Sequence, residues 1–170
     1  MTLRMLLGAV ALTLGAIALG GCQPHKQEDK ATVSSTTDLS PTSNQKFLSD
    51  NAQKPGVTRT ADGLQYRIIK SGSGKRVTGP NDMVTVTYKG QLINGKVFDQ
   101  TAPGKTAQFP AGGLIPGWVE ALSLMKEGDE WELVIPAELG YGSQGAGGVI
   151  PPDQTLVFDM TLISVAPAQQ

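Results

Sequence analysis

The chain has a single cysteine, a single histidine and few aromatic residues, and these shortages exclude several kinds of protein. Cys22 has no second cysteine among the 170 residues, so an internal disulfide is excluded. His25 lies in a polar segment near the N-terminus, so we expect neither histidine-based catalysis nor a metal site. The common nucleophilic triads are excluded for the same reason. The sequence predicts no bound cofactor.

The chain also lacks an excess of charge of either sign. Its formal net charge is -1, which gives no electrostatic reason to expect nucleic acid as a partner. One glycine-rich run, GYGSQG at residues 140–145, formally matches a dinucleotide-binding pattern. Such a site needs a helix directly after the glycines, whereas Gly147, Gly148 and Pro151 follow here. We therefore interpret the match as accidental.

The N-terminus predicts a lipoprotein signal. Arg4 precedes an apolar stretch at residues 5–19, and the following Gly20-Gly21-Cys22 resembles a bacterial lipobox. Residues 1–21 are therefore expected to be removed and Cys22 to carry the lipid that binds the membrane. Gln23 in the next position resembles lipoproteins of the outer membrane, facing the periplasm of the bacterial cell envelope. The alternative is an uncleaved signal anchor, since the apolar stretch approaches spanning length.

Residues 22–56 are expected to form a lipidated, flexible tether. Serine, threonine, glutamine and lysine dominate its first part, which has too few apolar residues to bury a core. A short helix is predicted at residues 45–53, ended by Pro55 and Gly56. The folded domain is then expected to occupy residues 57–170.

Alternating apolar and polar residues dominate that region, which is typical of an antiparallel sheet with one buried face. The pattern occurs at residues 64–68, 84–88, 130–135 and 156–163. In the first of these stretches Leu64, Tyr66 and Ile68 are predicted to face inward, with Gln65 and Arg67 on the opposite face.

One amphipathic helix is predicted to cover the buried face of the sheet. Pro116 suits a first helical position, and Trp118, Leu122 and Met125 follow at helical spacing over residues 117–127. Gly128 is expected to end the helix. The predicted fold class is α+β, with a four- to five-stranded antiparallel sheet around one helix.

Several ordered motifs resemble the FKBP-type peptidyl-prolyl cis-trans isomerases. They read VTVTYKGQLINGKVFD, LIPGWVEAL, VIPAELGYG and VIPPDQTLVFDM, and the resemblance covers residues 60–165. The resemblance implies an antiparallel half-barrel wrapped on one helix. Upstream, FLSDNAQKPGVTRTADGLQYRII resembles the bacterial Mip and FkpA-like branch. That branch usually carries a long helical dimerisation region, which the tether replaces here, so we expect a monomer.

The resemblance also implies the site residues. From pattern alone, Asp99 fits a surface or turn carboxylate, and Trp118 fits a core position. The family's catalytic residues correspond to Asp99 and Tyr141. Its substrate-binding residues correspond to Tyr88, Phe98, Phe109, Leu114, Ile115, Trp118, Ile150 and Phe158. In this interpretation Trp118 lies under the substrate proline, while the Ile115 amide and the Tyr141 hydroxyl bond the substrate backbone.

Two positions depart from the family pattern. Many members carry an arginine shortly after the Phe-Asp pair, where it supports the aspartate. This chain has Pro103 and Lys105 there, so Asp99 is expected to lack a guanidinium partner. Ala107 replaces a second aromatic residue two positions before Phe109, which predicts a wider pocket.

The implied activity is rotation of X-Pro bonds in proline-containing envelope polypeptides, with inhibition by macrolides. An apolar pocket suits this reaction because no side chain has to form a bond with the substrate. The alternative is a holdase chaperone or peptide-binding module that uses the same pocket with little turnover.

Overall fold

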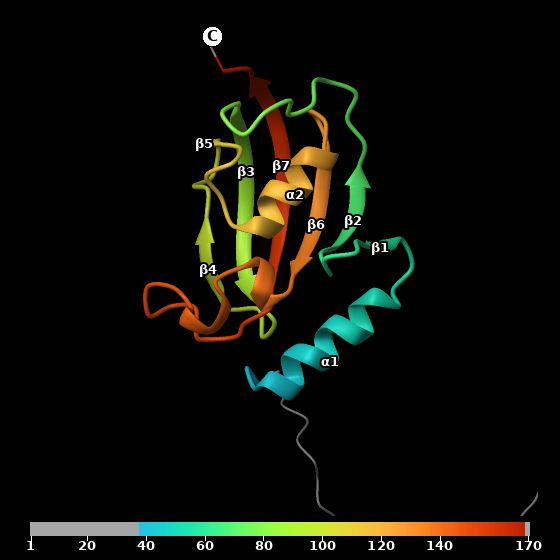
Figure 1. The fold of residues 1–170 in the computed structure, drawn as a ribbon, viewed down its shortest axis with the longest axis vertical. Helices are drawn as coiled ribbons and strands as arrows, with labels where there is room; N and C mark the ends of the chain where they lie inside the picture. The colour runs from blue at the N-terminus through green and yellow to red at the C-terminus, as the bar shows by residue number, and fades with distance from the viewer. Residues whose placement is uncertain (1–37, 169–170) are drawn as a thin grey trace, which may run out of the picture. The chain divides into compact units, whose positions relative to one another are not determined.

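Seven antiparallel strands form the sheet, in the order β1-β2-β6-β7-β3-β4, with β5 also pairing with β3 (Figure 1). The computed structural model describes residues 38–168. The strands are β1 (Val57–Arg59), β2 (Gln65–Lys70), β3 (Met83–Leu92), β4 (Val97–Gln100), β5 (Ala107–Pro110), β6 (Glu130–Ile135) and β7 (Leu156–Ala166). The α+β class and the antiparallel pairing are confirmed. The sheet has more strands than the four or five expected, because three short strands of three or four residues extend its edges.

The core lies between the sheet and the helix α2 (Pro116–Leu124), as Figure 1 shows. On β7, Leu156, Phe158, Met160 and Leu162 are all buried, and Val84 and Val86 of β3 face the same core. The period-two pattern therefore correctly predicted the buried face of the two longest strands.

The prediction was wrong for part of β2. Leu64 is buried, but Ile68 is 48% exposed, next to a β-bulge between Ile68 and Lys70. Gln65, predicted to face outward into solvent, is only 3% exposed. Its amide is covered by a helix: it donates to the Leu48 carbonyl (2.9 Å) and accepts from Asn51 Nδ2 (2.9 Å).

The helix α2 begins with Pro116 in its first turn, as predicted, but ends three residues before the expected end. Met125 has an extended backbone (φ -76°, ψ 161°), so the helix stops there rather than at Gly128. A Cβ built on Gly117 would lie 2.6 Å from Ile135. The glycine therefore lets the first turn of α2 lie directly against β6.

A second helix, α1 (Pro41–Ala52), begins four residues before the helix predicted at residues 45–53. Ser40 caps it, since its hydroxyl accepts from Ser43 N (3.2 Å), and Pro41 occupies the first turn. Because Asn44 and Asn51 on α1 are buried, the packed region begins upstream of Val57. The predicted signal peptide, Cys22 and the first part of the predicted tether lie outside the described residues. Neither α1 nor α2 has the length and apolar content of a membrane span.

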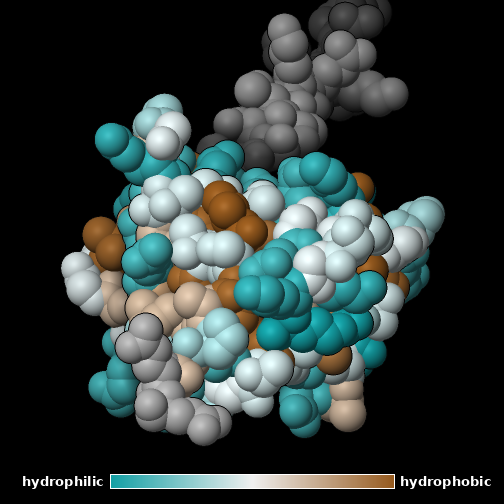
Figure 2. Space-filling view, turned by 90° about the horizontal axis from the view of Figure 1, so that it is seen from above, coloured by the Kyte–Doolittle hydropathy of each residue, from teal (hydrophilic) through white to brown (hydrophobic). Residues whose placement is uncertain are grey.

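Carboxylates hold the loop between β2 and β3, which crosses the top of the domain in Figure 1. Asp82 Oδ2 accepts from Thr78 N (2.7 Å), Thr78 Oγ1 (2.8 Å) and Gly79 N (3.0 Å). Its Oδ1 accepts from Ala168 N (3.1 Å), which ties the C-terminal segment to the loop. Seen from above, this end of the domain is mostly polar, with separate apolar patches (Figure 2). Asp129 accepts from Gly72 N and Glu127 from Lys75 N, so three carboxylates hold the loop, with Asp82 making the most of these bonds.

We expect Asp82→Asn to lower the melting temperature at pH 7 and to reduce its dependence on acid. The backbone and hydroxyl hydrogen bonds from Thr78 lower the pKa of Asp82 to about 2. A lowered folded-state pKa stabilises the fold above the unfolded-state pKa, about 3.9, and this contribution is lost as pH falls through the folded-state value. Thermal unfolding followed by circular dichroism should therefore show the difference in melting temperature between the two proteins disappearing by about pH 2. A constant difference from pH 7 to pH 2 would contradict the prediction.

Candidate functional site

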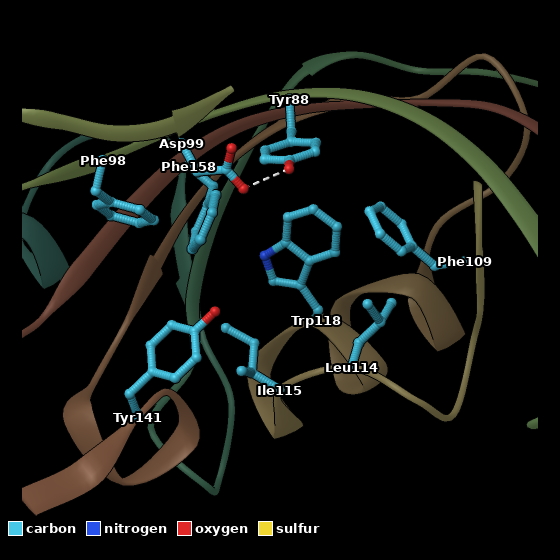
Figure 3. A pocket seen from close by; sticks show the side chains of 9 residues that line it. All are labelled: Tyr88, Phe98, Asp99, Phe109, Leu114, Ile115, Trp118, Tyr141 and Phe158. Carbon is cyan, nitrogen blue, oxygen red and sulfur yellow. Dashed lines mark hydrogen bonds between the residues drawn. The ribbon is translucent and has the colours of Figure 1, made fainter. Parts of the chain in front are cut away.

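A cavity of about 150 Å³ opens between the sheet, the start of α2 and the loop after β6 (Figure 3). Nine of the ten catalytic and binding residues expected from the sequence line it. They are Tyr88, Phe98, Asp99, Phe109, Leu114, Ile115, Trp118, Tyr141 and Phe158. Seven different structural elements or loops contribute these residues, so the complete fold is needed to bring them together.

Trp118 lies at the centre of an aromatic cluster. Its ring meets Tyr88 (5.0 Å between centroids, 81°) and Phe158 (5.2 Å, 80°) edge to face, and Phe109 at 6.1 Å and 82°. Phe98 meets Phe158 in the same way (5.5 Å, 86°). Aromatic rings prefer edge-to-face or offset-stacked contacts over face-to-face stacking. Trp118 is only 4% exposed, so the cavity has a fixed apolar floor.

Gly90 makes this cluster possible, although neither the alternation nor the motifs predicted a role for it. It lies on β3 opposite Asp99 of β4 and Phe158 of β7. A Cβ at this position would lie 2.6 Å from the ring of Phe158 and 2.7 Å from that of Phe98. A glycine inside a strand often marks such a close approach, so Gly90 in the run TYKGQL was the available signal.

Asp99 has the Tyr88 hydroxyl as its partner. Tyr88 Oη donates to Asp99 Oδ2 at 2.6 Å, as Figure 3 shows. Within residues 38–168 the ion pairs are Lys46–Asp50 and Arg67–Glu132, so Lys105 does not replace the missing arginine. Burial, and then the hydrogen bond to Asp99, raise the pKa of Tyr88 above its ordinary value. The hydroxyl therefore stays protonated and remains a donor.

Tyr141 directs its hydroxyl into the cavity from the opposite side (Figure 3). It lies between two short 3₁₀ helices, η1 (Ala137–Leu139) and η2 (Gly142–Gln144), and is 38% exposed. Partial burial, together with the charge of Asp99, raises its pKa. No residue in the described part of the chain hydrogen-bonds this hydroxyl, so it is available to a ligand.

Ile150 is the one predicted site residue that does not line the cavity. It is 5% exposed and belongs to the hydrophobic core. Its backbone N–H and carbonyl both bond Ala146 (3.0 and 2.9 Å). Ile150 thus supports the loop that carries Tyr141.

The described cavity is suited to binding an apolar ring beside polar backbone groups. Its walls are neutral except for Asp99, and that carboxylate already accepts a hydrogen bond. Ile115, the residue before α2, and Tyr141 lie at its edge, where they can meet the backbone of an extended peptide (Figure 3).

The comparison with known families agrees with this geometry. The model of the FKBP-type peptidyl-prolyl cis-trans isomerases matches residues 74–163, just over half of the chain. The chain belongs to this FKBP family. The model of the domain amino-terminal to FKBP-type isomerases matches residues 17–68.

FKBP-type relatives match most of this chain. The FKBP-type 22 kDa peptidyl-prolyl cis-trans isomerase of Escherichia coli is 51% identical over 121 residues, which are 71% of this chain and 58% of the relative. The outer membrane protein MIP of Legionella longbeachae is 50% identical over 123 residues, 72% of this chain and 52% of the relative. This chain thus spans between half and three-fifths of each of these relatives.

Two solved FKBP-family structures have the same fold. The crystal structure of FkpA from Escherichia coli superposes with a TM-score of 0.71 and 41% identity, over 75% of this chain and 60% of that one. A peptidyl-prolyl cis-trans isomerase from Pseudomonas syringae superposes with a TM-score of 0.69 and 37% identity, over 74% of this chain and 92% of that one.

Proposed function

We propose that this protein is a peptidyl-prolyl cis-trans isomerase that accelerates rotation about X-Pro bonds in proteins of the bacterial envelope. The observation that carries the proposal is the aromatic cavity over Trp118, with the Tyr141 hydroxyl directed into it and Asp99 as the only charged residue among those that line it in the described structure. Membership of the FKBP family supports the same activity.

The reaction needs no bond between the enzyme and its substrate. Rotation breaks amide resonance, a barrier of about 18–20 kcal/mol, and takes about 10–100 s without a catalyst. The twisted amide has less charge separation than the planar one, so an apolar cavity binds it better than the ground state. Such selective binding of the transition state lowers the barrier. In this proposal the proline ring lies over Trp118 while the preceding carbonyl turns.

Polar groups then position the substrate. The Tyr141 hydroxyl and the Ile115 N–H bond the backbone on either side of the proline. Asp99 holds the Tyr88 ring in place through the 2.6 Å hydrogen bond, which fixes the wall of the cavity. The structural partner of Asp99 favours this shape-keeping role over direct contact with the rotating carbonyl.

The test is an exchange measurement on the full chain. Magnetisation-transfer NMR on a short proline peptide measures cis-trans exchange without a coupled protease. We expect faster exchange with the protein and return to the uncatalysed rate when a macrolide occupies the cavity. Exchange at the uncatalysed rate would overturn the proposal. If the protein then still suppressed aggregation of an unfolded client, the holdase function would be favoured.

We also propose that a lipid on Cys22 anchors the protein, as a monomer, to the outer membrane facing the periplasm. The lipobox-like Gly20-Gly21-Cys22 supports this location, and a relative named outer membrane protein MIP is consistent with it. Two or three acyl chains give stable anchoring, whereas one binds only marginally.

We expect Cys22→Ser to move the protein out of the membrane fraction and to abolish its labelling by radioactive palmitate. Gln23→Asn, a change beside the cysteine that keeps the thiol, is the matched control and should remain lipidated. Fractionation and labelling of cells expressing each protein measure both effects. Palmitate labelling of the Cys22→Ser protein would contradict the proposed anchor.

A further inference from the structure

The helix α1 contacts the rest of the domain through two buried amide side chains. Asn44 is 4% exposed and Asn51 is 2% exposed, and these two are the buried residues of the helix. They lie seven residues apart, about two helical turns, and therefore on the same face. A buried amide destabilises a fold unless it is hydrogen-bonded. The partners of each asparagine thus decide what the helix holds in place.

Asn44 bonds the segment that follows the Val-Ile-Pro-Pro corner. Its Oδ1 accepts from the backbone N–H of Thr155 (2.8 Å), and its Nδ2 donates to Gln154 Oε1 (3.2 Å). Gln154 is 5% exposed, and its Nε2 donates to the carbonyls of Leu39 (3.1 Å) and Pro152 (2.9 Å). Asn44 of α1 therefore bonds residues 154–155, and Gln154 in turn bonds Leu39, just before α1, so the two segments are joined by hydrogen bonds from each side.

Residues 152–155 close the loop that carries Tyr141. The N–H of Asp153 donates to the carbonyl of Gly142 (2.9 Å), directly beside Tyr141. Asp153 has a positive φ of 59°, in the left-handed region that residues other than glycine seldom adopt. Such a conformation persists only where its neighbours hold it, and the next two residues are those bonded to Asn44.

We propose that Asn44 and Gln154 are positioning residues for Tyr141. In this inference α1 fixes residues 152–155, these hold the backbone at Gly142, and the Tyr141 hydroxyl is thereby kept directed into the cavity. The inference rests on the proposed function, because that function gives the Tyr141 hydroxyl its contact with the substrate backbone.

Asn51 provides a matched control on the same helix. Its Nδ2 donates to Gln65 Oε1 (2.9 Å), and Gln65 lies on β2, which contributes no residue to the cavity in the described structure. Asn44→Ala and Asn51→Ala each remove one buried amide from α1. Both should lower the melting temperature, but only Asn44→Ala should disturb the loop around Tyr141.

The experiment compares these variants in the full chain. We expect Asn44→Ala to lower kcat/KM for a proline peptide about 3–10-fold, the order expected for one misplaced hydrogen bond, mainly by raising KM. Asn51→Ala should stay within about twofold of the unsubstituted protein. Hydrogen exchange should become faster at residues 141–155 in Asn44→Ala alone. Equal losses of activity in both variants, or unchanged activity in Asn44→Ala, would overturn the proposal.

A double-mutant cycle tests whether Asn44 acts through Tyr141. In a Tyr141→Phe background, Asn44→Ala should cause little further loss, because the hydroxyl that it positions is gone. Independent, additive losses would contradict the inference. Gln154→Ala removes the partner of Asn44 in the loop and should cause the same loss of activity as Asn44→Ala. The test therefore stands if one of the two variants fails to fold.

Failure of this inference is distinguishable from failure of the proposed function. The hydrogen-exchange comparison needs no turnover. Peptide binding can be followed by tryptophan fluorescence, because Trp118, one of the two tryptophans, lines the cavity. If the unsubstituted protein does not accelerate cis-trans exchange of the proline peptide, the proposed function fails. If instead residues 141–155 exchange at the same rate in Asn44→Ala and the unsubstituted protein, the positioning role fails.

Discussion

Replacing Gly90 by alanine is expected to lower kcat/KM for a proline peptide by roughly 5- to 150-fold, because overpacking of the cavity wall costs about 1–3 kcal/mol. The added methyl group would lie 2.6–2.7 Å from the rings of Phe158 and Phe98. The rings must then move, and Phe158 also packs on Trp118. The displacement therefore reaches the cavity floor. Peptide exchange measures the loss, and near-ultraviolet circular dichroism reports the rearranged rings.

Gly79 is the matched control for this change. It lies in the loop between β2 and β3, and a Cβ built there meets no atom within 4 Å. Gly79→Ala should leave activity and the aromatic circular dichroism unchanged. Normal activity in Gly90→Ala would show that the aromatic wall tolerates the displacement, which would contradict the prediction.

The second large effect is expected at the Tyr88–Asp99 pair. Asp99→Ala and Tyr88→Phe should each reduce kcat/KM about tenfold or more. Each substitution removes one partner of the charge-assisted hydrogen bond and leaves the remaining polar group unpaired. The double variant should be no worse than the poorer single variant, because both changes break the same 2.6 Å contact. Peptide exchange on the four proteins measures the coupling. Additive losses would show that Asp99 and Tyr88 act separately.

The pH dependence provides a further check on this pair. Burial and Asp99 raise the pKa of Tyr88, so its hydroxyl should remain a donor through the range where an ordinary tyrosine ionises, near pH 10. In an alkaline titration followed by tyrosinate absorbance, Tyr88→Phe should remove an ionisation that occurs at higher pH than that of an ordinary tyrosine. Loss of an ordinary tyrosine ionisation instead would contradict this assignment.

The sequence predicted the buried face of the sheet where strands are long and covered by α2. At β7 the alternation of Leu156, Phe158 and Met160 identifies the face that packs against α2, although Val157 on the opposite face is also buried. It was insufficient at Gln65, which is buried by α1 rather than by the sheet's own core. Periodicity within one strand carries no information about a helix that packs on it from outside.

The residues around the cavity show the same limit. Motif resemblance named the nine lining residues, yet it did not predict that Tyr88 would bond Asp99 or that Gly90 would lie beneath Phe98 and Phe158. These contacts depend on strand register, with Gly90 opposite Asp99 on one side and Phe158 on the other. Asp99 and Phe158 lie 9 and 68 positions after Gly90, and no local sequence pattern predicts which residues of such strands lie opposite one another.

The position of β7 has a consequence for how the protein is made. It is the last strand within residues 38–168, yet it lies between β6 and β3 and pairs with both along most of its length. A chain that has emerged from the ribosome only as far as β6 therefore has two half-sheets with nothing to join them. Such non-local pairing is slow to form. The order of synthesis thus delays assembly of the sheet until β7 has been made.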